Sequence, residues 1–339
     1  MHIEQKITVR MLVNKYEVLT PFDREIWQEE LEDFVPPFIF DAHTHLWDRR
    51  FAPSENCRTP EVGFDDLNAW SKQVFPSRKI GFLLLGTPVA GMKLDGFHEF
   101  MAREIAKSPF HLGSTIVTPA VQPEELDSLI GQYHFCGLKP YRLFADDPAN
   151  CRITDYFPEG LIEVADRHRL CITMHMAKFD GIADPQNLAD LRYLTGRYPH
   201  VRWILAHCAR AFNPFTLEKN IFLLRDLPNL WYDLSAVCSA RSHYLLMKHE
   251  NTSRLLFGTD NIFAGGIHGS YITWGKGWEF FRGMEVGHCR KDATLVCYEQ
   301  LRAMKQAADM AGLSRGQVES IFFRNAMNFF GFQSFPEQP

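Results

Sequence analysis

Two histidines separated by one residue follow a short apolar run, and this pair is the clearest chemical signal in the chain. The segment FIFDAHTH covers residues 38–45. Side chains two residues apart in a strand point to the same face, so His43 and His45 are expected to leave the strand end side by side. Neutral imidazole is the commonest side-chain metal ligand near neutral pH. The segment therefore predicts a two-nitrogen clamp for a metal, although ordinary surface histidines often show the same spacing.

Four more residues with metal-site or catalytic chemistry stand at the ends of later apolar runs. They are Lys139, His175, His207 and Asp260. In a parallel barrel the carboxyl ends of the strands meet at one mouth, where the active site lies. The chain has 14 histidines, so one histidine at a strand end carries little weight. Four histidines and an aspartate in such places predict a shared site.

Eight apolar runs recur at the spacing of one strand plus one helix. They are Phe38–His43, Ile80–Gly86, Gly113–Thr118, Phe135–Tyr141, Leu170–His175, Val201–His207, Leu230–Ser235 and Arg254–Thr259. Continuous apolar runs are typical of parallel strands covered by helices, and helical patterns lie between these runs. Eight such units over about 220 residues predict an α/β fold, the (β/α)₈ TIM barrel.

The predicted barrel domain takes up most of the chain. It spans residues 38–332, after an N-terminal extension of residues 1–37 and before a tail of residues 333–339. In the extension, Ile7–Val13 is predicted to be a strand and Asp23–Phe34 an acidic helix.

Two connecting segments and two closing helices complete the predicted architecture. Trp47–Trp70 is expected to form a long loop after the first strand, and loops of that length are usually functional. Residues 261–290 form a glycine- and aromatic-rich insertion after the eighth strand. Asp292–Ala311 and Ser314–Phe330 are predicted to be the closing helices.

Composition excludes several function classes. The formal net charge is -5 and no run of lysine or arginine stands out, so we expect no nucleic-acid partner. No apolar stretch is long enough to cross a bilayer, and the first residues lack the layout of a signal peptide. Eight scattered cysteines without a CxxC pair predict free thiols and a reducing cytoplasm. We expect a small-molecule substrate, no membrane partner, and a homodimer or higher homo-oligomer.

Taken together, these residues resemble the amidohydrolase superfamily, and most closely its amidohydrolase-related (amidohydrolase 2) branch. That branch contains metal-dependent TIM-barrel hydrolases, lactonases and non-oxidative decarboxylases. The resemblance spans residues 38–332 and rests on the segments DAHTH (41–45), AHC (206–208), GTD (258–260) and NAMNFFG (325–331), together with His175.

The resemblance implies that His43, His45, His175 and Asp260 hold one divalent metal. Imidazole and carboxylate ligands suit Zn²⁺, and Mn²⁺ and Fe²⁺ remain alternatives. Asp260 would also accept a proton from the metal-activated water. His207 would lie beside the open position, where it polarises a carbonyl oxygen or binds a second metal.

Lys139 has three interpretations. In binuclear members of the superfamily a lysine at the end of the fourth strand is carboxylated and bridges two metals. In the mononuclear branch a similar lysine stays cationic near the substrate, which is the interpretation we favour. A lysine that merely pairs with a neighbouring carboxylate is the third.

Several residues outside the ligand set are weaker candidates for substrate contact. Arg142 and Arg210 could grip a substrate carboxylate or form surface ion pairs, and the surface pair is favoured for Arg142. Trp47 either lines the pocket or packs within its loop. His268, in the insertion, is expected to be a solvent-exposed loop histidine.

The leading functional hypothesis is metal-dependent hydrolysis of a small amide, lactone or ester. The alternative is a metal-dependent decarboxylase, a lyase that acts on an aromatic or dienoic carboxylic acid. A third class is a catalytically dead barrel used for binding. A purified chain with well under one metal per subunit would favour that third class.

Overall fold

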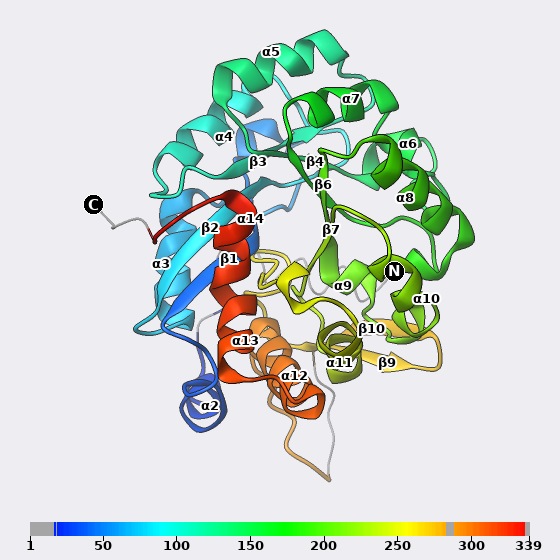
Figure 1. The fold of residues 1–339 in the computed structure, drawn as a ribbon. Coiled ribbons are helices and arrows are strands. Elements are labelled where there is room, and N and C mark those ends of the chain that lie inside the picture. Colours follow the sequence, from blue (N-terminus) through cyan, green and yellow to red (C-terminus); the bar gives the residue numbers. More distant parts are fainter. Residues whose placement is uncertain (1–16, 18, 283–287, 336–339) are drawn as a thin grey trace.

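The centre of the protein is an eight-stranded sheet in which every neighbouring pair of strands is parallel (Figure 1). The structure, a computed structural model, describes residues 17, 19–282 and 288–335. The strands follow one another around the sheet in chain order, which confirms the predicted (β/α)₈ barrel. Their bounds are β1 (Phe38–Leu46), β2 (Lys79–Gly86), β3 (Gly113–Val117), β4 (Gly137–Pro140), β5 (Cys171–Met174), β6 (Arg202–Leu205), β7 (Leu230–Asp233) and β8 (Leu255–Leu256).

The barrel closes where the segment after β8 runs beside β1. The amide of Asp260 donates to the carbonyl of His43 at 2.9 Å, and the amide of His45 donates to the carbonyl of Asn261, also at 2.9 Å. The closure therefore places Asp260 directly beside the histidine pair, although more than 200 residues separate them along the chain.

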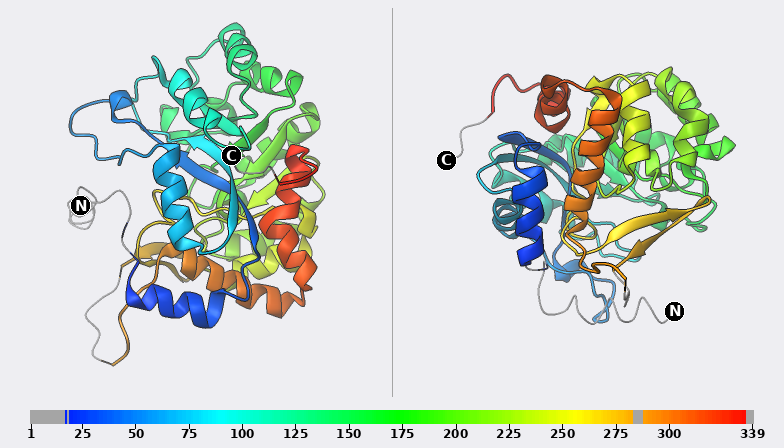
Figure 2. Two further views of the ribbon diagram at one scale, coloured as in Figure 1. Left: turned by 90° about the vertical axis from the view of Figure 1, so that its left-hand side faces the viewer. Right: turned by 90° about the horizontal axis from the view of Figure 1, so that it is seen from below.

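Helices join the strands and surround the barrel (Figures 1 and 2). Those between strands are α3 (Phe64–Val74), α4 (Phe97–Ala106), α5 (Pro123–Tyr133), α6 (Ile153–Tyr156), α7 (Glu159–Arg167), α8 (Pro185–Arg197), α9 (Ala206–Arg210), α10 (Phe215–Arg225) and α11 (Ala240–His249). Those outside the strand series are α2 (Pro21–Ile26), the π-helical turn η1 (Trp27–Leu31), α12 (Val296–Ala311), α13 (Arg315–Glu319), the π-helical turn η6 (Ser320–Arg324) and α14 (Asn325–Phe330).

The structure corrects one predicted connection and shifts the bounds of the helix predicted in the extension. The expected long loop Trp47–Trp70 contains the start of α3, and Trp47 forms an antiparallel bridge to Val62 that shortens the loop. The predicted acidic helix of the extension is α2 followed by η1. The predicted strand Ile7–Val13 lies outside the described residues.

The amino-terminal end of the barrel is closed by aromatic residues from the end of the chain. Phe329 of α14 packs edge-on against Trp231 at the start of β7, with ring centroids 4.9 Å apart. Its carbonyl accepts a hydrogen bond from Arg202 at the start of β6. Phe40 of β1 packs against Phe330 at 5.4 Å. This packing accounts for the phenylalanines near the C-terminus and leaves the opposite end of the strands for a site.

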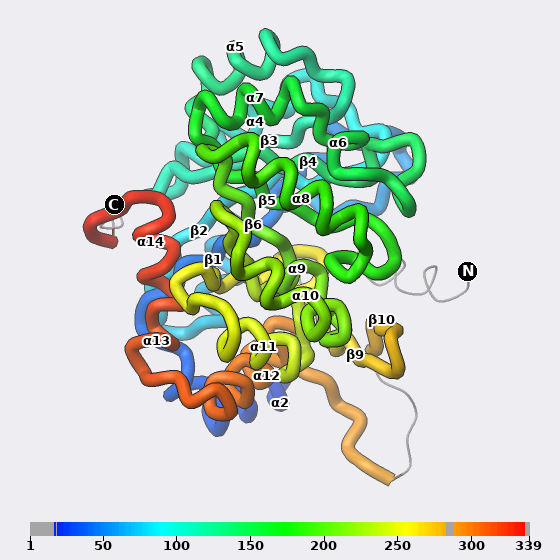
Figure 3. Tube along the Cα trace, turned by 45° about the vertical axis from the view of Figure 1, so that its right-hand side comes forward, coloured from blue at the N-terminus to red at the C-terminus, as the bar shows by residue number. Residues whose placement is uncertain are grey.

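The insertion after β8 contains an antiparallel hairpin of two strands, β9 (Ser270–Trp274) and β10 (Gly277–Phe281). Gly275 in its turn has a φ of 49°, a left-handed conformation that glycine adopts readily. In Figure 3 the hairpin lies beside α10, apart from the eight-stranded sheet.

The N-terminal extension is fastened to the same insertion through His268. Its Nε2 lies 2.8 Å from Asp23 Oδ2 and its Nδ1 lies 2.5 Å from Glu17 Oε2. Asp23 also caps α2 by accepting from the amide and hydroxyl of Thr20. The expectation that His268 is a solvent-exposed loop histidine is therefore wrong, because two carboxylates from a distant part of the chain enclose it.

We expect Asp23→Asn to destabilise the protein by roughly 2 kcal/mol, because a buried carboxylate that accepts several hydrogen bonds is lost. Burial by itself raises the pKa of Asp23, but hydrogen bonds from His268 and Thr20 outweigh it and lower the pKa below the usual value. As the pH falls, the unfolded chain therefore binds a proton before folded Asp23 does. The stabilisation is complete above about pH 4 and is lost below it.

Thermal unfolding from pH 3 to pH 7 measures this effect. The difference between the wild-type protein and Asp23→Asn should shrink as the pH falls below about 4. A matched control is Asp226→Asn, because the side chain of Asp226 is 76% exposed and lies 3.9 Å from the Arg225 guanidinium in a loose surface ion pair. A constant difference across the range would contradict the assignment.

All eight cysteines are free thiols, and four of them are buried. This agrees with the expectation that disulfides do not hold the fold together. In the part of the chain that the structure describes, no helix has both the length and the apolar character needed to span a bilayer.

Candidate metal centre

Three side chains bring ligand atoms together at the carboxyl end of the barrel. His43 Nε2 lies 3.1 Å from His45 Nε2. Asp260 Oδ1 lies 3.5 Å from the first nitrogen and 3.4 Å from the second. A tetrahedral ion with bonds of about 2.0–2.1 Å separates its ligand atoms by about 3.3–3.4 Å. The three atoms are therefore spaced as they would be around one divalent cation.

The hydrogen bonds of His43 and His45 show which ring nitrogen carries the proton and which one is free to bind a metal. His43 Nδ1 lies 3.0 Å from Asp233 Oδ2, and His45 Nδ1 lies 3.3 Å from the carbonyl oxygen of Gly86. Both partners only accept, so each Nδ1 carries the proton and each Nε2 presents a lone pair. Two lone pairs and a carboxylate oxygen face one another with no donor between them. A cation would turn this repulsive arrangement into a favourable one, so the donor set fits a metal.

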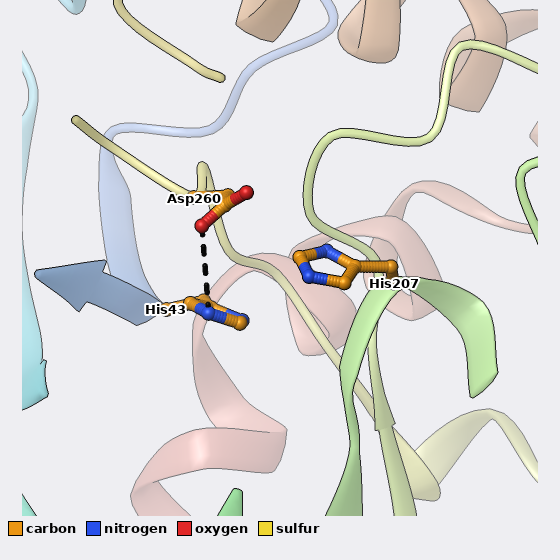
Figure 4. A group of neighbouring side chains, drawn as sticks. All are labelled: His43, His207 and Asp260. Carbon is orange, nitrogen blue, oxygen red and sulfur yellow. Dashed lines mark ion pairs between the residues drawn. The ribbon is translucent and has the colours of Figure 1, made fainter. Parts of the chain in front are cut away.

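His207 lies beside this set. His43, Asp260 and His207 each offer a ligand atom within 4.8 Å of the others, and Figure 4 shows the three side chains pointing toward one another. The ring centroids of His207 and His43 are 4.9 Å apart. His207 Nδ1 lies 3.1 Å from the carbonyl oxygen of Ser235, so its Nε2 is also the free nitrogen. The structure thus places His207 in the same group as the possible ligands, whereas we predicted that it stands next to them.

His175, the residue after β5, lies beside His207 and is not part of the group formed by His43, His207 and Asp260. Its ring lies 5.2 Å from His207 and 5.0 Å from Tyr141, measured between centroids. Its Nδ1 lies 3.2 Å from the carbonyl oxygen of Met176, which again leaves Nε2 as the lone pair. All four histidines therefore follow one rule: an oxygen acceptor holds Nδ1–H and Nε2 is available for a metal.

Burial keeps these groups in the charge states that metal binding needs. It lowers the pKa of His43 to about 4 and also lowers the pKa of His45 and His175. For Asp260, burial raises the pKa, but His207, His45 and His43 together lower it to about 2. Near neutral pH the imidazoles are neutral and Asp260 is charged, which is the ligand form of each.

Asp233, at the end of β7, supports the site from behind and was not among the predicted residues. Besides His43, it accepts hydrogen bonds from the amide of His207 at 3.2 Å and the amide of Ser235 at 3.1 Å. The hydroxyl of Ser235 donates to it as well. Asp233 is fully buried. Burial raises its pKa, but His43 and His207 lower it more, so it stays charged.

Asp41 joins the first and last strands of the site. It accepts from the amide of His43 at 3.1 Å and from the amide and hydroxyl of Thr259 at 2.9 and 2.6 Å. Thr259 directly precedes Asp260 along the chain, and His43 is itself one of the possible ligands. Burial raises the pKa of Asp41 to about 7 despite these hydrogen bonds. Asp41 thus holds the histidine pair in register with Asp260.

His207 is presented by a left-handed turn. His207, Cys208, Ala209 and Arg210 all have φ between 54° and 60°. This conformation costs an L-residue other than glycine roughly 1–2 kcal/mol. Surrounding bonds hold the turn, including one of 3.6 Å from the thiol of Cys208 to His243 Nδ1. His243 can accept there because its Nε2 donates to the carbonyl of Val237. Strain of this kind persists only where tertiary structure enforces it.

Three cationic side chains lie around the mouth of the barrel. Lys139 is buried and forms no hydrogen bond or ion pair with any described residue; burial lowers its pKa to about 8. Arg142 and Arg210 are half-buried and donate to the carbonyls of Pro148 and Lys178. Arg142 Nε is buried without a described partner. The surface ion pair favoured for Arg142 is absent among the described residues.

The sequence comparison decides the family of this protein. A family model described as Amidohydrolase matches residues 40–332. The chain belongs to the amidohydrolase family. A search of curated proteins finds no match for this chain.

Solved structures share the fold at low sequence identity. A probable 2-pyrone-4,6-dicarboxylic acid hydrolase from Acinetobacter baumannii has a TM-score of 0.57 and 14% identity, covering 87% of this chain and 99% of that one. The 4-oxalomesaconate hydratase of Rhodopseudomonas palustris has a TM-score of 0.53 and 14% sequence identity, and the match covers 86% of this chain and 95% of that one. The 5-carboxyvanillate decarboxylase of Sphingomonas paucimobilis has a TM-score of 0.51 and 14% sequence identity, and the match covers 88% of this chain and 100% of that one.

Other predicted residues of this amidohydrolase lie outside the metal centre. Trp47 is fully buried and packs against Phe51 and Phe97, with centroids 6.4 Å from each, so it offers no surface to a substrate. Met174 and Met176 are fully buried packing residues. Asn325 donates to the carbonyls of Thr252 and Leu255, and these two hydrogen bonds anchor the start of the last helix.

Proposed function

We propose that this amidohydrolase hydrolyses a small lactone, ester or amide that carries a carboxylate group, using one divalent metal, Zn²⁺ in the first instance. His43, His45, His175 and Asp260 would hold the metal, with His207 beside them. The observation that supports this most strongly is the arrangement of the histidines: every Nδ1 lies 3.0–3.3 Å from an oxygen acceptor, and every Nε2 is left with a lone pair.

The roles of the protein residues follow from their charge states. A bound divalent cation supplies Lewis acidity and lowers the pKa of a bound water to about 7. Asp260 is charged and next to the histidine pair, so it accepts the proton of the attacking water and passes it to the leaving group. His207 carries its proton on Nδ1, so its neutral form accepts at Nε2. Polarising a carbonyl oxygen, its role in the sequence-based hypothesis, requires the doubly protonated ring.

Lys139, Arg142 and Arg210 support the choice of an acidic substrate. The Lys139 ammonium lies 5.8 Å from the centre of the Tyr141 ring, and that ring packs against His175 with centroids 5.0 Å apart. The charges of all three cations lower the pKa of His175. A cluster of cations with few carboxylate partners is a binding environment for an anion. We propose that Lys139 stays uncarboxylated and binds the carboxylate of the substrate, so that the site holds one metal.

Decarboxylation is the second candidate, and the same cations favour it. They would hold an acid group beside the metal, and two of the similar structures are a 5-carboxyvanillate decarboxylase and a 2,6-dihydroxybenzoate decarboxylase. In that reaction Asp260 or His207 would protonate the carbon that loses CO₂.

Incubation of the metal-loaded protein with two substrate panels separates the candidates. One panel contains lactones, esters and amides that bear a carboxylate, and the other contains aromatic and dienoic acids. Incorporation of ¹⁸O from water into the product supports the hydrolase, and release of CO₂ without ¹⁸O supports the decarboxylase. A chain with well under one metal per subunit and no turnover would instead indicate a binding barrel.

We expect Lys139→Met to weaken binding of benzoate, a simple carboxylate probe, by about tenfold or more, because a charged hydrogen bond is lost while side-chain length is kept. Isothermal titration of the Zn²⁺-loaded protein measures this. Lys72→Met, at an exposed position of α3, is the matched control. Equal affinity in both variants would remove Lys139 from substrate binding, and two metals per chain would indicate its carboxylated form.

A further inference from the structure

The hairpin β9–β10 is fastened to the segment that follows His207. The side-chain amide of Asn213 donates to the carbonyls of Gly275 and Gly277 at 3.1 and 2.9 Å, so it holds the hairpin turn. Its neighbour Phe212 packs against the His207 ring, with centroids 5.4 Å apart. Two consecutive residues thus link the metal centre to an insertion that is far away in sequence (Figures 1 and 3).

One face of the hairpin is turned toward the site. In the antiparallel register Tyr271 pairs with Phe280, and Thr273 pairs with Trp278, so these four side chains share a face. Phe212 packs against this face, 4.4 Å from Trp278 and 4.6 Å from Tyr271 between ring centroids. On the opposite face Ile272 and Trp274 are exposed. The inner face therefore forms an aromatic wall that continues from His207.

Tyr271 is the member of this wall that carries a polar group. Among the described residues none forms a hydrogen bond with its hydroxyl, although the side chain is half-buried. The Tyr271 ring packs on Phe212, which in turn packs on His207, so one aromatic ring separates Tyr271 from that histidine. Burial raises the pKa of Tyr271, so its hydroxyl stays protonated and can donate. Tyr141 lies on the other side of the centre against His175, and its hydroxyl likewise has no described partner. A phenol left without a partner at the mouth of the site is available to a ligand.

We propose that Tyr271 is a substrate-binding residue, which the hairpin carries to the metal centre so that its hydroxyl donates a hydrogen bond to an oxygen of the bound substrate. This inference rests on the proposed function, since it assigns the phenol to the same site. It also gives the insertion a role in binding, because β9–β10 supplies one wall of the substrate pocket, and Phe212 and Asn213 keep that wall in place.

Benzoate binding to the Zn²⁺-loaded protein tests the role of the hydroxyl. We expect Tyr271→Phe to bind benzoate about tenfold or more weakly than the wild-type protein, with unchanged metal content and melting temperature. The matched control is Tyr244→Phe in α11, a half-buried tyrosine whose ring contacts His249; it should bind benzoate as the wild-type protein does. Equal affinity of Tyr271→Phe and the wild-type protein would overturn the proposal. So would a wild-type protein that fails to bind benzoate at millimolar concentration.

These outcomes separate the inference from the function on which it rests. Metal content and turnover with the two substrate panels test the proposed function without reference to Tyr271. Metal-dependent turnover combined with unchanged benzoate affinity in Tyr271→Phe would remove this inference alone. A chain without metal or turnover would remove the proposed function first.

Asn213→Asp tests whether the hairpin positions the Tyr271 hydroxyl at the metal centre. Aspartate keeps the oxygen that accepts from the amide of Phe215 but loses both donors to the hairpin turn. We expect benzoate affinity to fall about as much as in Tyr271→Phe, and the double variant to show little further loss, because both changes remove one contact. Losses that multiply in the double variant, or an Asn213→Asp protein with wild-type affinity, would contradict delivery by the hairpin.

Discussion

Asp260→Asn is expected to keep much of the metal and to lose at least about 10²–10³-fold in kcat. Asparagine retains an oxygen that can lie where Asp260 Oδ1 lies, 3.4–3.5 Å from the two histidine nitrogens. It cannot take up a proton, however, and removal of a positioned general base typically costs a factor of 10²–10⁴. Metal analysis and steady-state kinetics with the substrate found in the panels measure the two effects separately.

The control for this variant is Asp226→Asn, at the exposed end of α10, which should match the wild-type protein in both measurements. Unchanged turnover in Asp260→Asn would exclude Asp260 as the proton relay. Complete loss of metal would instead show that its negative charge is indispensable for binding the cation.

The parts of the site that follow from strand periodicity could be predicted from the sequence. His43 and His45 share a face because alternate residues of a strand do so, and β1 continues through both of them. Asp260 follows the last strand, and in a closed barrel the last strand lies beside the first. These relations need only local structure and one fold-level rule, which explains why the sequence could bring these three proposed ligands together.

The position of Asp233 at the end of a predicted strand could have marked it as a site residue. Asp233 is the last residue of β7, inside one of the eight predicted strands. A single carboxylate without a neighbouring histidine does not have the pattern of a metal ligand. Its role is different, because it accepts four hydrogen bonds behind the ligands. Roles that depend on hydrogen bonds to other strands become visible only when those strands are placed in space.

The left-handed turn at His207 had no local signal at all. The apolar run predicted a strand as far as His207, but β6 ends at Leu205 and four residues other than glycine then take positive φ. Their own propensities oppose this conformation, so tertiary contacts impose it. His268 was misjudged for a related reason, since Asp23 and Glu17 from a distant part of the chain enclose it. The same limit left the two interpretations of Trp47 open, because Phe97, which packs against it, comes from α4.

Asp233→Asn is expected to weaken metal binding by about 10–100-fold while leaving every proposed ligand in the chain. Asp233 Oδ1 accepts from three donors, the amides of His207 and Ser235 and the hydroxyl of Ser235, whereas Oδ2 accepts only from His43 Nδ1. The single oxygen of asparagine should therefore take the Oδ1 place, and its NH₂ group should face His43. His43 Nδ1 must then accept, which moves the ring proton to Nε2 and removes the lone pair from the metal side.

Competition with a chromophoric chelator measures the Zn²⁺ affinity of this variant. Asp190→Asn is the matched control, because Asp190 is also a buried carboxylate but pairs with Arg152 away from the site. We expect both variants to melt earlier than the wild-type protein and only Asp233→Asn to lose metal affinity. If the two bind Zn²⁺ equally well, Asp233 contributes to folding and not to the tautomer of His43. A selective loss would show that a carboxylate outside the ligand set decides which imidazole nitrogen is available to the metal.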